Sequence, residues 1–250
     1  MIRVNLRSRV VIGWRGRRTS NRLANSCRKR RFPKEGRKHE VVVYRERTER
    51  LEKERERRER TRHQINGLLR SWRKDLASGG TNNAISCAGV ETVVQRLSKL
   101  GRFSRGSSVF VDLGCSVGIP SIYVALLTGA RTIGIEKDAE LVARARKNAE
   151  ACGVSERCTF VCMDLNELTP EWFSEQSVTH VMAFDAVFGE KVLTHLYECL
   201  AAVQGPLVGA GTSTSCRYWS PFLTQVGRSS TAVKLAGRGA SSFRFRFWRK

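Results

Sequence analysis

Short apolar runs alternate with longer segments of helical periodicity through the C-terminal two thirds of the chain. Each run has the length and composition of a strand that is buried on both faces of a sheet. The runs are residues 108–111, 131–136, 158–163, 178–184 and 206–211. Because helical segments separate most of them, the pattern predicts parallel strands joined by right-handed crossovers, which is an α/β fold.

The connecting segments and the C-terminus complete this pattern. Apolar residues recur at helical spacing over residues 119–128, 139–151 and 190–203. Residues 230–235 and 241–248 flank the turn G-R-G-A and alternate like the strands of an antiparallel hairpin. The sequence therefore predicts a Rossmann-like parallel sheet that ends in an antiparallel hairpin at its edge.

The residues before this region follow a different pattern. Between Tyr44 and Arg62, glutamate and arginine recur three and four positions apart, which supports a solvated helix through ion pairs worth roughly 0.2 to 0.5 kcal/mol each. Apolar residues then recur at helical spacing and predict a face that docks on the domain. These residues are Ile65, Leu68, Leu69, Trp72 and Leu76. We expect a basic disordered tail over residues 1–43, a charged helical extension over 44–80 and the α/β domain over 81–250.

Charge divides the chain in similar places. Residues 1–80 hold 26 lysines and arginines against 9 acidic residues, residues 81–198 hold 11 against 14, and residues 199–250 hold 8 against none. Such an excess of positive charge acts on polyanions, because each neutralised phosphate releases counterions. The basic N- and C-terminal segments are therefore predicted to bind nucleic acid, or a particle wrapped in it. A solvated charged helix is the alternative for residues 44–62.

The sequence predicts neither a membrane segment nor a metal site. It contains no run of 18 apolar residues, and its first 38 residues have no long apolar face to insert into a membrane surface. Its eight cysteines include no C-x-x-C pair. We therefore expect reduced cysteines, no bound metal and an intracellular protein.

The N-terminal tail is consistent with two destinations. Arg28 to Arg31, followed by Pro33 and Lys34, resemble a nuclear import signal or a nucleic-acid patch. The first 34 residues are also arginine-rich and contain no acidic residue, as mitochondrial transit peptides do. We expect the nucleus, with the mitochondrion as the alternative.

The clearest chemical signal begins at Val109, where the sequence reads V-F-V-D-L-G-C-S-V-G. Gly114 and Gly118 bracket a turn after a buried strand, and such a turn lets the backbone come close to a ligand. Glu136 ends the next strand, twenty-four positions after Asp112. Ligands of open parallel sheets bind at the carboxyl ends of the strands, and a carboxylate there accepts hydrogen bonds from both hydroxyls of a ribose.

These residues predict a site for S-adenosylmethionine, with Asp112 near the amino acid end of the cofactor. Lys137 follows Glu136 and is included in the site, and Asp164 after the third strand is predicted to accept from the adenine amino group. A strand-ending aspartate is also a common helix cap. Two further interpretations stay open. The first is a dinucleotide site, although this requires G-x-G-x-x-G, which G-C-S-V-G does not supply. The second is a glycine turn that binds no ligand, as such turns often do.

Five runs, in order, resemble successive motifs of the disruptor of telomeric silencing family. They are V-E-T-V-V-Q-R-L at 90–97, V-F-V-D-L-G-C-S-V-G at 109–118, G-I-E-K at 134–137, Asp164, and V-F-G at 187–189. Members of that family are histone-lysine methyltransferases that lack a SET domain and act on a lysine at the nucleosome face. The resemblance covers roughly residues 89–248 and implies a class I, seven-stranded S-adenosylmethionine-dependent methyltransferase. It also implies that Glu91 and Thr92 belong to the loop that closes over the amino acid end of the cofactor.

The chain departs from that family at several positions. Ser116 replaces a glycine in the middle of the turn, where a left-handed backbone would cost about 1 kcal/mol. Phe184 and Asp185 stand where the family has two asparagines, and Ala88 lies near the place of its usual tyrosine. The arginine-rich extension replaces the helical domain that normally precedes the loop.

The residues after the fourth strand are the candidates for the methyl-acceptor side of the site, where catalysis is expected. Transfer from a sulfonium to an amine is an in-line displacement that requires alignment in a dry channel more than an acid or a base. Phe184, Asp185 and Phe188 follow this strand, where the acceptor approaches. A far wall of the channel is assigned to Tyr218, Trp219 and Phe222. Grouped aromatic residues are also typical of a core.

The sequence therefore predicts an enzyme that methylates a nucleosomal histone lysine. A methyltransferase of RNA or of a non-histone protein is one alternative, because the basic flanks suit RNA as well as nucleosomes. The N-P-P-Y type run expected for methylation of RNA base amino groups is absent after the fourth strand, where F-D-A-V stands. The other alternative is a non-catalytic chromatin- or RNA-binding module with a decayed pocket, for which Ser116 gives some support.

Overall fold

The computed structural model describes residues 34–75, 85–219, 222–234 and 242–250. It forms two compact units, Met1–Glu49 and Arg50–Lys250, and the second unit contains the whole sheet. The predicted disordered tail lies for the most part outside the described residues. Residues 34–43 are described, and they are helical rather than disordered.

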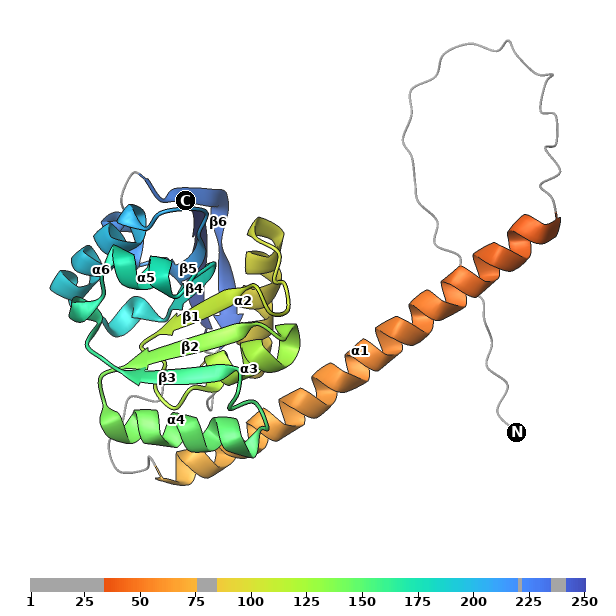
Figure 1. Cartoon of the computed structure of the whole chain (residues 1–250), viewed down its shortest axis with the longest axis horizontal. Coiled ribbons are helices and arrows are strands. Elements are labelled where there is room, and N and C mark those ends of the chain that lie inside the picture. The colour runs from red at the N-terminus through yellow and green to blue at the C-terminus, as the bar shows by residue number, and fades with distance from the viewer. Residues whose placement is uncertain (1–33, 76–84, 220–221, 235–241) are drawn as a thin grey trace, which may run out of the picture. The chain divides into compact units, whose positions relative to one another are not determined.

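A seven-stranded sheet forms the centre of the second unit, with the strand order β3-β2-β1-β4-β5-β7-β6 (Figure 1). The strands are β1 (Val109–Leu113), β2 (Arg131–Glu136), β3 (Cys158–Cys162), β4 (His180–Ala183), β5 (Val208–Thr212), β6 (Thr224–Lys234) and β7 (Ser242–Arg249). The first five strands run parallel to their neighbours, whereas β7 is antiparallel to both β5 and β6. The predicted Rossmann-like sheet with its antiparallel C-terminal hairpin is confirmed.

Helices cover both faces of the sheet and enclose two apolar cores (Figure 1). The first face carries α2 (Cys87–Leu100), α3 (Ile119–Thr128) and α4 (Ala139–Ala151), and the second carries α5 (Pro170–Glu175) and α6 (Glu190–Ala202). Successive side chains of a strand point to opposite faces, so β1 contributes to both cores. Phe110 joins the first core, whereas Val111 and Leu113 join the second.

Local capping residues set the bounds of the helices that flank the glycine turn. Gly118 precedes α3 and Gly129 follows it, both with a left-handed backbone that glycine adopts without steric cost. The carboxylate of Asp138 accepts from the backbone N–H groups of Glu140 and Leu141 at the start of α4. These signals lie within a few residues of each helix end, and α3 and α4 have the bounds that the sequence pattern predicts.

The C-terminal hairpin places β7 inside the sheet and β6 at its edge. Phe245 and Phe247 pack into the first core, and Trp248 packs into the second, because β7 is covered on both faces. β6 begins at Thr224, before the predicted residue 230, and its pairing with β7 shifts between Val226 and Thr231. A shift of this kind interrupts the alternation of side chains, which hid the first half of β6 from the sequence pattern.

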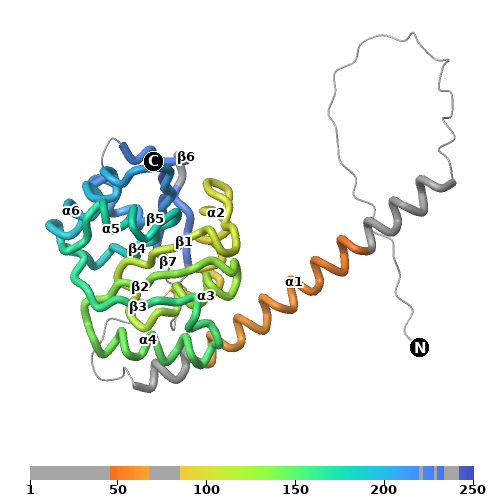
Figure 2. The backbone as a smooth tube through the Cα atoms, in the orientation of Figure 1, coloured from red at the N-terminus to blue at the C-terminus, as the bar shows by residue number. Residues whose placement is uncertain are grey.

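The charged helix α1 (Lys34–Asp75) begins ten residues before its predicted start at Tyr44. From Arg50 onward it belongs to the same compact unit as the sheet, and Figure 2 shows this part of α1 beside α4. Gln64 Nε2 donates to the carbonyl of Ala151 at 3.2 Å, and Arg57 Nη2 donates to that of Leu126 at 2.7 Å. Both acceptors lie at helix C-termini, where basic and polar donors satisfy free carbonyl groups.

The strongest contact of α1 with the domain is an ion pair between Arg62 and Glu91 of α2. Arg62 Nε donates to Glu91 Oε1 at 2.6 Å, and its Nη2 donates to Glu91 Oε2. The Tyr123 hydroxyl of α3 also donates to Glu91, whose side chain is 8% exposed. Burial acts to raise the pKa of Glu91, but the hydrogen bonds from Arg62 and Tyr123 outweigh it and the pKa is lowered. Ile65 is fully buried one turn later, so this part of α1 is built into the fold. The domain boundary predicted at residue 80 stays a prediction.

Candidate active site

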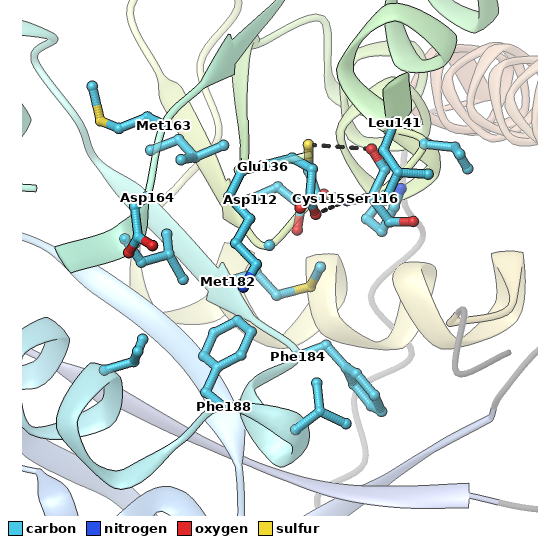
Figure 3. Close-up of a pocket in the computed structure, with 18 of the residues that line it drawn as sticks. Asp112, Cys115, Ser116, Glu136, Leu141, Met163, Asp164, Met182, Phe184 and Phe188 are labelled. Atoms are coloured by element: carbon cyan, nitrogen blue, oxygen red, sulfur yellow. Dashed lines mark hydrogen bonds between the residues drawn. The ribbon is translucent and has the colours of Figure 1, made fainter. Parts of the chain in front are cut away.

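A pocket of about 540 Å³ opens at the carboxyl ends of β1, β2, β3 and β4, on the edge where parallel sheets bind ligands (Figure 3). The volume is within the range of cofactor sites. The first group of lining residues comes from the turn after β1 and from the end of β2: Asp112, Gly114, Cys115, Ser116, Val117, Ile135, Glu136 and Lys137. The second comes from the residues after β3 and β4: Met163, Asp164, Leu165, Met182, Phe184, Val187, Phe188, Gly189 and Val192. Ile85, Ile119, Pro120 and Leu141 complete the lining.

The glycine turn has the backbone conformation that its sequence predicts. Gly114 and Gly118 have φ angles of 74° and 78°, and the N–H groups of Gly114 and Cys115 both donate to the carbonyl of Ile135 at 2.9 Å. A Cβ atom on Gly114 would lie 2.8 Å from Phe188 Cζ. Ser116 also has a positive φ, of 50°, so the residue that stands in place of the expected glycine is left-handed, which costs roughly 1 to 2 kcal/mol.

Glu136 lies directly beside this turn, which brings together the two features on which the sequence-based prediction depends (Figure 3). Its Oε2 accepts from the Ser116 backbone N–H at 3.0 Å, and its Oε1 accepts from the Asp138 N–H at 3.2 Å. Each carboxylate oxygen carries two lone pairs, so each keeps one for a ligand hydroxyl. The strand ends therefore offer a carboxylate and bare backbone to a single ligand.

Asp112 is the most deeply buried acid of the pocket, at 2% exposure. Burial raises its pKa to about 7, against a hydrogen bond from Ser121 Oγ at 3.0 Å that lowers it, and the charge of Glu136 raises it further. Because the folded-state pKa is above the unfolded value, ionising Asp112 as the pH rises toward 7 costs folding free energy. A cationic ligand group beside Asp112 would reduce that cost.

Asp164 and Lys137 lie on the pocket wall, as predicted, but their roles there stay predictions. Asp164 Oδ1 accepts from the backbone N–H and the side-chain amide of Asn166, each at 2.8 Å, and so caps the short helix η1 (Leu165–Glu167). The bond from the Asn166 N–H lowers the pKa of Asp164. Asp164 therefore caps this helix through Oδ1, and its other carboxylate oxygen, Oδ2, takes no part in the cap.

The side of the pocket that follows β4 is apolar. Phe184 and Phe188 lie on the same side of the pocket, across from Glu136 and Asp112 (Figure 3). The ring of Phe184 meets Phe243 edge-on at 4.8 Å between centroids and stacks on Phe245 at 6.0 Å. None of the lining residues that β4, α6 and the segment between them contribute carries an ionisable side chain, so this side offers desolvation and shape rather than an acid or a base.

Asp185 does not line the pocket, which corrects the prediction that it lies beside the acceptor. It is 1% exposed and lies in the short helix η2 (Asp185–Val187). Its carboxylate accepts from Thr212 and from Tyr197, neither of which lines the pocket. A buried carboxylate requires donors, and these are supplied by β5 and α6 rather than by the pocket.

Glu91 and Thr92 are also absent from the lining, contrary to the prediction that they close over the cofactor. Glu91 is held by Arg62 and Tyr123, and Thr92 Oγ1 donates to the Ala88 carbonyl at 2.8 Å within α2. A carboxylate in contact with a guanidinium is stabilised where it is, so Glu91 faces α1. The neighbouring residue that does line the pocket is Ile85.

The aromatic far wall predicted from Tyr218, Trp219 and Phe222 is not part of the pocket either. Trp219 packs against Tyr197 and Trp248 in the second core, and Phe222 is 73% exposed. The 3-10 helix η3 (Ser215–Tyr218) leads the chain onto the α6 face, away from the acceptor side. The aromatic support comes instead from Phe243 and Phe245 of β7, which no local pattern connects with the site.

Most of the apolar lining was not predictable from local motifs. The apolar lining includes Leu141, Met163, Leu165, Met182, Val187 and Val192. Each is an ordinary apolar residue of its own helix or strand. Met163 had one usable signal, because it immediately precedes the strand-ending Asp164.

Two features are absent from residues 34–75, 85–219, 222–234 and 242–250. Across these ranges, no three His, Cys, Asp or Glu side chains come close enough to hold a metal ion. Nor does any helix within them combine the length and the apolar character that crossing a membrane requires.

Comparison with known proteins adds a family match over the centre of this unit. Residues 110–205 match the family model described as a methyltransferase domain. A 23S rRNA (uracil(1939)-C(5))-methyltransferase of Acidithiobacillus ferrooxidans is 32% identical over 101 residues, which are 40% of this chain and 22% of that protein. A release factor glutamine methyltransferase of Chlorobaculum tepidum is 40% identical over 76 residues, which are 30% of this chain and 26% of that protein. The chain thus spans about a quarter of the length of these curated relatives.

The chain also aligns with solved structures. An RNA methyltransferase from Salinibacter ruber in complex with S-adenosyl-L-homocysteine is 26% identical and aligns over 62% of this chain and 87% of that chain, with a TM-score of 0.42. The matched range, residues 110–205, contains the glycine turn, Glu136, Asp164 and the residues after β4. It excludes all of α1 and both strands of the C-terminal hairpin.

Proposed function

We propose that this protein, whose residues 110–205 form a methyltransferase domain of the class that uses S-adenosylmethionine, methylates a lysine of a nucleosomal histone. The observation that carries the proposal is a single pocket with two different sides. Glu136 and the glycine turn lie on one side, and Phe184 and Phe188 lie on the other.

The residues of the first side fit the cofactor. The Glu136 carboxylate offers lone pairs to the ribose hydroxyls, and Gly114 supplies the left-handed turn, with no Cβ to collide with the Phe188 ring. Asp112 is a buried carboxylate whose side-chain hydrogen bond comes from the neutral hydroxyl of Ser121, which suits the ammonium group of an amino acid. When bound, S-adenosylmethionine supplies an electrophilic methyl group that a neutral amine accepts by in-line displacement.

The residues of the second side favour a lysine as the acceptor. A lysine has an apolar stem of four methylene groups, which Phe184, Val187 and Phe188 can cover. Desolvation between apolar side chains lowers the pKa of an amine and favours its neutral form. Positioning and desolvation are therefore the contributions that this side can make, in agreement with its lack of ionisable groups.

The charge of the flanks supports a nucleosome as the particle that presents the lysine. Basic residues are concentrated before residue 80 and after residue 199, whereas residues 81–198 are slightly acidic. Such flanks bind phosphates without reading a base sequence, and nucleosomal DNA presents many phosphates near the histone surface. This assignment also implies a nuclear protein.

An RNA methyltransferase is the second candidate. The matched 23S rRNA methyltransferase and the solved RNA methyltransferase are named for that substrate class, and the basic flanks suit RNA equally well. The apolar acceptor side argues against methylation of a base amino group, which is expected to require polar contacts after β4. A binding module with a decayed pocket would be supported if Ser116 prevented cofactor binding.

The test has two stages. Isothermal titration with S-adenosylmethionine first separates either enzyme from a decayed pocket, because a decayed pocket would release no binding heat. Transfer of a tritiated methyl group to nucleosomes, free histones and total RNA then ranks the substrates. The proposal predicts label on a histone lysine in nucleosomes, and label confined to RNA would replace it with the second candidate.

Replacing Glu136 by alanine is expected to weaken S-adenosylmethionine binding by about 1.5 to 3 kcal/mol, the worth of hydrogen bonds to a charged acceptor. This corresponds to a dissociation constant roughly ten to a hundred times higher, measured by titration calorimetry. Glu140→Ala is the matched control, because Glu140 is an exposed acid in the first turn of α4 and does not line the pocket. Equal affinities of the two variants would remove Glu136 from the site.

Deleting residues 1–49 is expected to reduce binding to nucleosomes or RNA without changing cofactor affinity. The deletion removes 16 of the 45 basic residues and leaves the second compact unit complete. Each lost phosphate contact should reduce the log-log salt slope by roughly 0.9, measured by binding at several salt concentrations. The cut is placed before Arg50 because Arg57 and Arg62 contact the domain. Loss of cofactor affinity would show that the first unit is part of the binding fold.

A further inference from the structure

A buried hydrogen-bond network lies beneath the residues that form the acceptor side of the pocket. Asp185 Oδ1 accepts from the Thr212 backbone N–H at 2.8 Å and also from its hydroxyl. Asp185 Oδ2 accepts from the Tyr197 hydroxyl at 2.5 Å. Ser215 Oγ lies 3.3 Å from the same hydroxyl and donates to the Thr212 carbonyl at 2.8 Å. The network therefore joins the segment after β4 to α6 and to the end of β5.

All members of this network are removed from water. Asp185, Tyr197, Thr212 and Ser215 are each 1% exposed. The carboxylate of Asp185 accepts hydrogen bonds from three donors, all of them neutral. A buried carboxylate without a cation is costly, and hydrogen bonds to the charged group are what offset that cost. These three donors thus explain how an aspartate is tolerated at this buried position.

The network is also packed so closely that the neighbouring strand has no room for a side chain. A Cβ atom on Gly211 of β5 would lie 3.0 Å from Asp185 Oδ2 and closer still to the Tyr197 hydroxyl. Asp185 is followed in η2 by Val187, and the Phe188 N–H donates to the Asp185 carbonyl at 3.1 Å. Phe184 directly precedes Asp185, so both rings of the acceptor side are joined to Asp185 by a short stretch of backbone.

We propose that Asp185 is a positioning residue, which through its bonds to Tyr197 and Thr212 fixes the segment that carries Phe184 and Phe188 and so keeps the Phe188 ring beside Gly114. The inference rests on the proposed methyl transfer for its effect on turnover, whereas the placement of the rings is a property of the chain itself. Phe188 is the ring that a Cβ on Gly114 would meet at 2.8 Å. Releasing Asp185 would let that ring move from the turn and widen the channel between the two sides of the pocket.

Three variants test this inference in the full-length protein. Tyr197→Phe removes the donor to Oδ2 while keeping the ring in the core. Asp185→Asn keeps an acceptor for the Thr212 N–H, whereas Asp185→Ala keeps none. Thr132→Val is the matched control, because Thr132 is a fully buried hydroxyl that donates to Cys158 Sγ on the opposite edge of the parallel strands.

Hydrogen exchange of the backbone amides gives the readout that does not depend on activity. In Tyr197→Phe and both Asp185 variants, amides 186–189 and 212 are expected to exchange about tenfold faster, while β1 and β2 stay protected. Thr132→Val should leave amides 186–189 unchanged. Equal exchange of these amides in wild type and all Asp185 variants would overturn the inference.

Kinetics on the methylated substrate gives the second readout. Tyr197→Phe is expected to lower kcat about tenfold per folded molecule while changing the KM for S-adenosylmethionine little, because alignment is lost rather than cofactor binding. Asp185→Asn should recover part of the turnover that Asp185→Ala loses. Unchanged kcat in every variant would overturn the inference. Should the wild type bind no S-adenosylmethionine, the proposed function fails, and hydrogen exchange still decides whether Asp185 holds the two rings.

Discussion

Replacing Arg62 by alanine is expected to lower the free energy of unfolding by about 2 to 3 kcal/mol. Removing one partner of a buried ion pair costs roughly 3 to 5 kcal/mol, and the value is reduced here because the Arg62 side chain is 44% exposed. The loss arises at Glu91, which is 8% exposed and would lose both hydrogen bonds from Arg62 while keeping the one from the Tyr123 hydroxyl. Urea unfolding followed by circular dichroism measures the effect.

Arg58→Ala is the matched control for this prediction. Arg58 lies one turn earlier on α1 and pairs with Glu54 at the i, i+4 spacing, and its charge is the smallest of the influences that lower the Glu91 pKa. Such pairs contribute about 0.3 to 0.5 kcal/mol. Equal stabilities of the Arg58 and Arg62 variants would show that α1 is not held by Glu91 in solution.

The pH dependence of the same pair has a definite sign. The pKa of Glu91 is lowered in the folded protein, although burial alone would raise it. A carboxyl group of this kind contributes stability above its unfolded pKa and loses that contribution as the pH falls through its folded pKa. In Arg62→Ala the lowering from Arg62 is absent and burial dominates. The stability gap between wild type and variant should therefore narrow as the pH is lowered through this range.

The parts of the fold that the sequence predicted best are those whose signals are local. β2, α3 and α4 have the predicted bounds because Asp138, Gly118 and Gly129 lie at the helix ends and fix them by backbone geometry. The first half of β6 was missed because a register shift breaks the alternation there. The helix at residues 34–43 was missed because high charge was interpreted as disorder, although it is compatible with a solvated helix.

The contrast between local and distant signals also explains which residues of the candidate site could be predicted. The glycine turn and Glu136 were predictable because a turn and a strand end each carry their own signal, and adjacent parallel strands bring them together. Glu91 and Asp185 were placed wrongly because their hydrogen-bond partners are distant in sequence: Arg62 lies 29 residues before Glu91, and Thr212 lies 27 residues after Asp185. A buried carboxylate is oriented by its donors, and no local pattern shows where they are.

Replacing Gly118 by alanine is expected to cost about 3 kcal/mol of folding free energy, from two separate sources. The first is the backbone, because a φ of 78° costs an L-residue roughly 1 to 2 kcal/mol. The second is overpacking, because the new Cβ would lie 2.5 Å from Phe160 Cε1 and 3.0 Å from the Ala145 Cβ, a clash worth about 1 to 3 kcal/mol. The same edge of the Phe160 ring also lies against Gly134 of β2, where a Cβ would be 2.6 Å from Phe160 Cδ1.

Gly153→Ala separates these two sources. Gly153 has a φ of 66°, similar to that of Gly118, but a Cβ atom there would meet nothing within 4 Å. Its replacement should cost the backbone contribution alone, so the difference between the two variants in urea unfolding measures the overpacking. Combining Gly118→Ala with Phe160→Leu should recover part of that difference, because the two sites are in contact and their effects are not additive. If Gly118→Ala were no more costly than Gly153→Ala, Phe160 would not pack beneath the glycine turn. The close approach of β1, β2 and α4, which shapes the cofactor side of the pocket, would then not exist in solution.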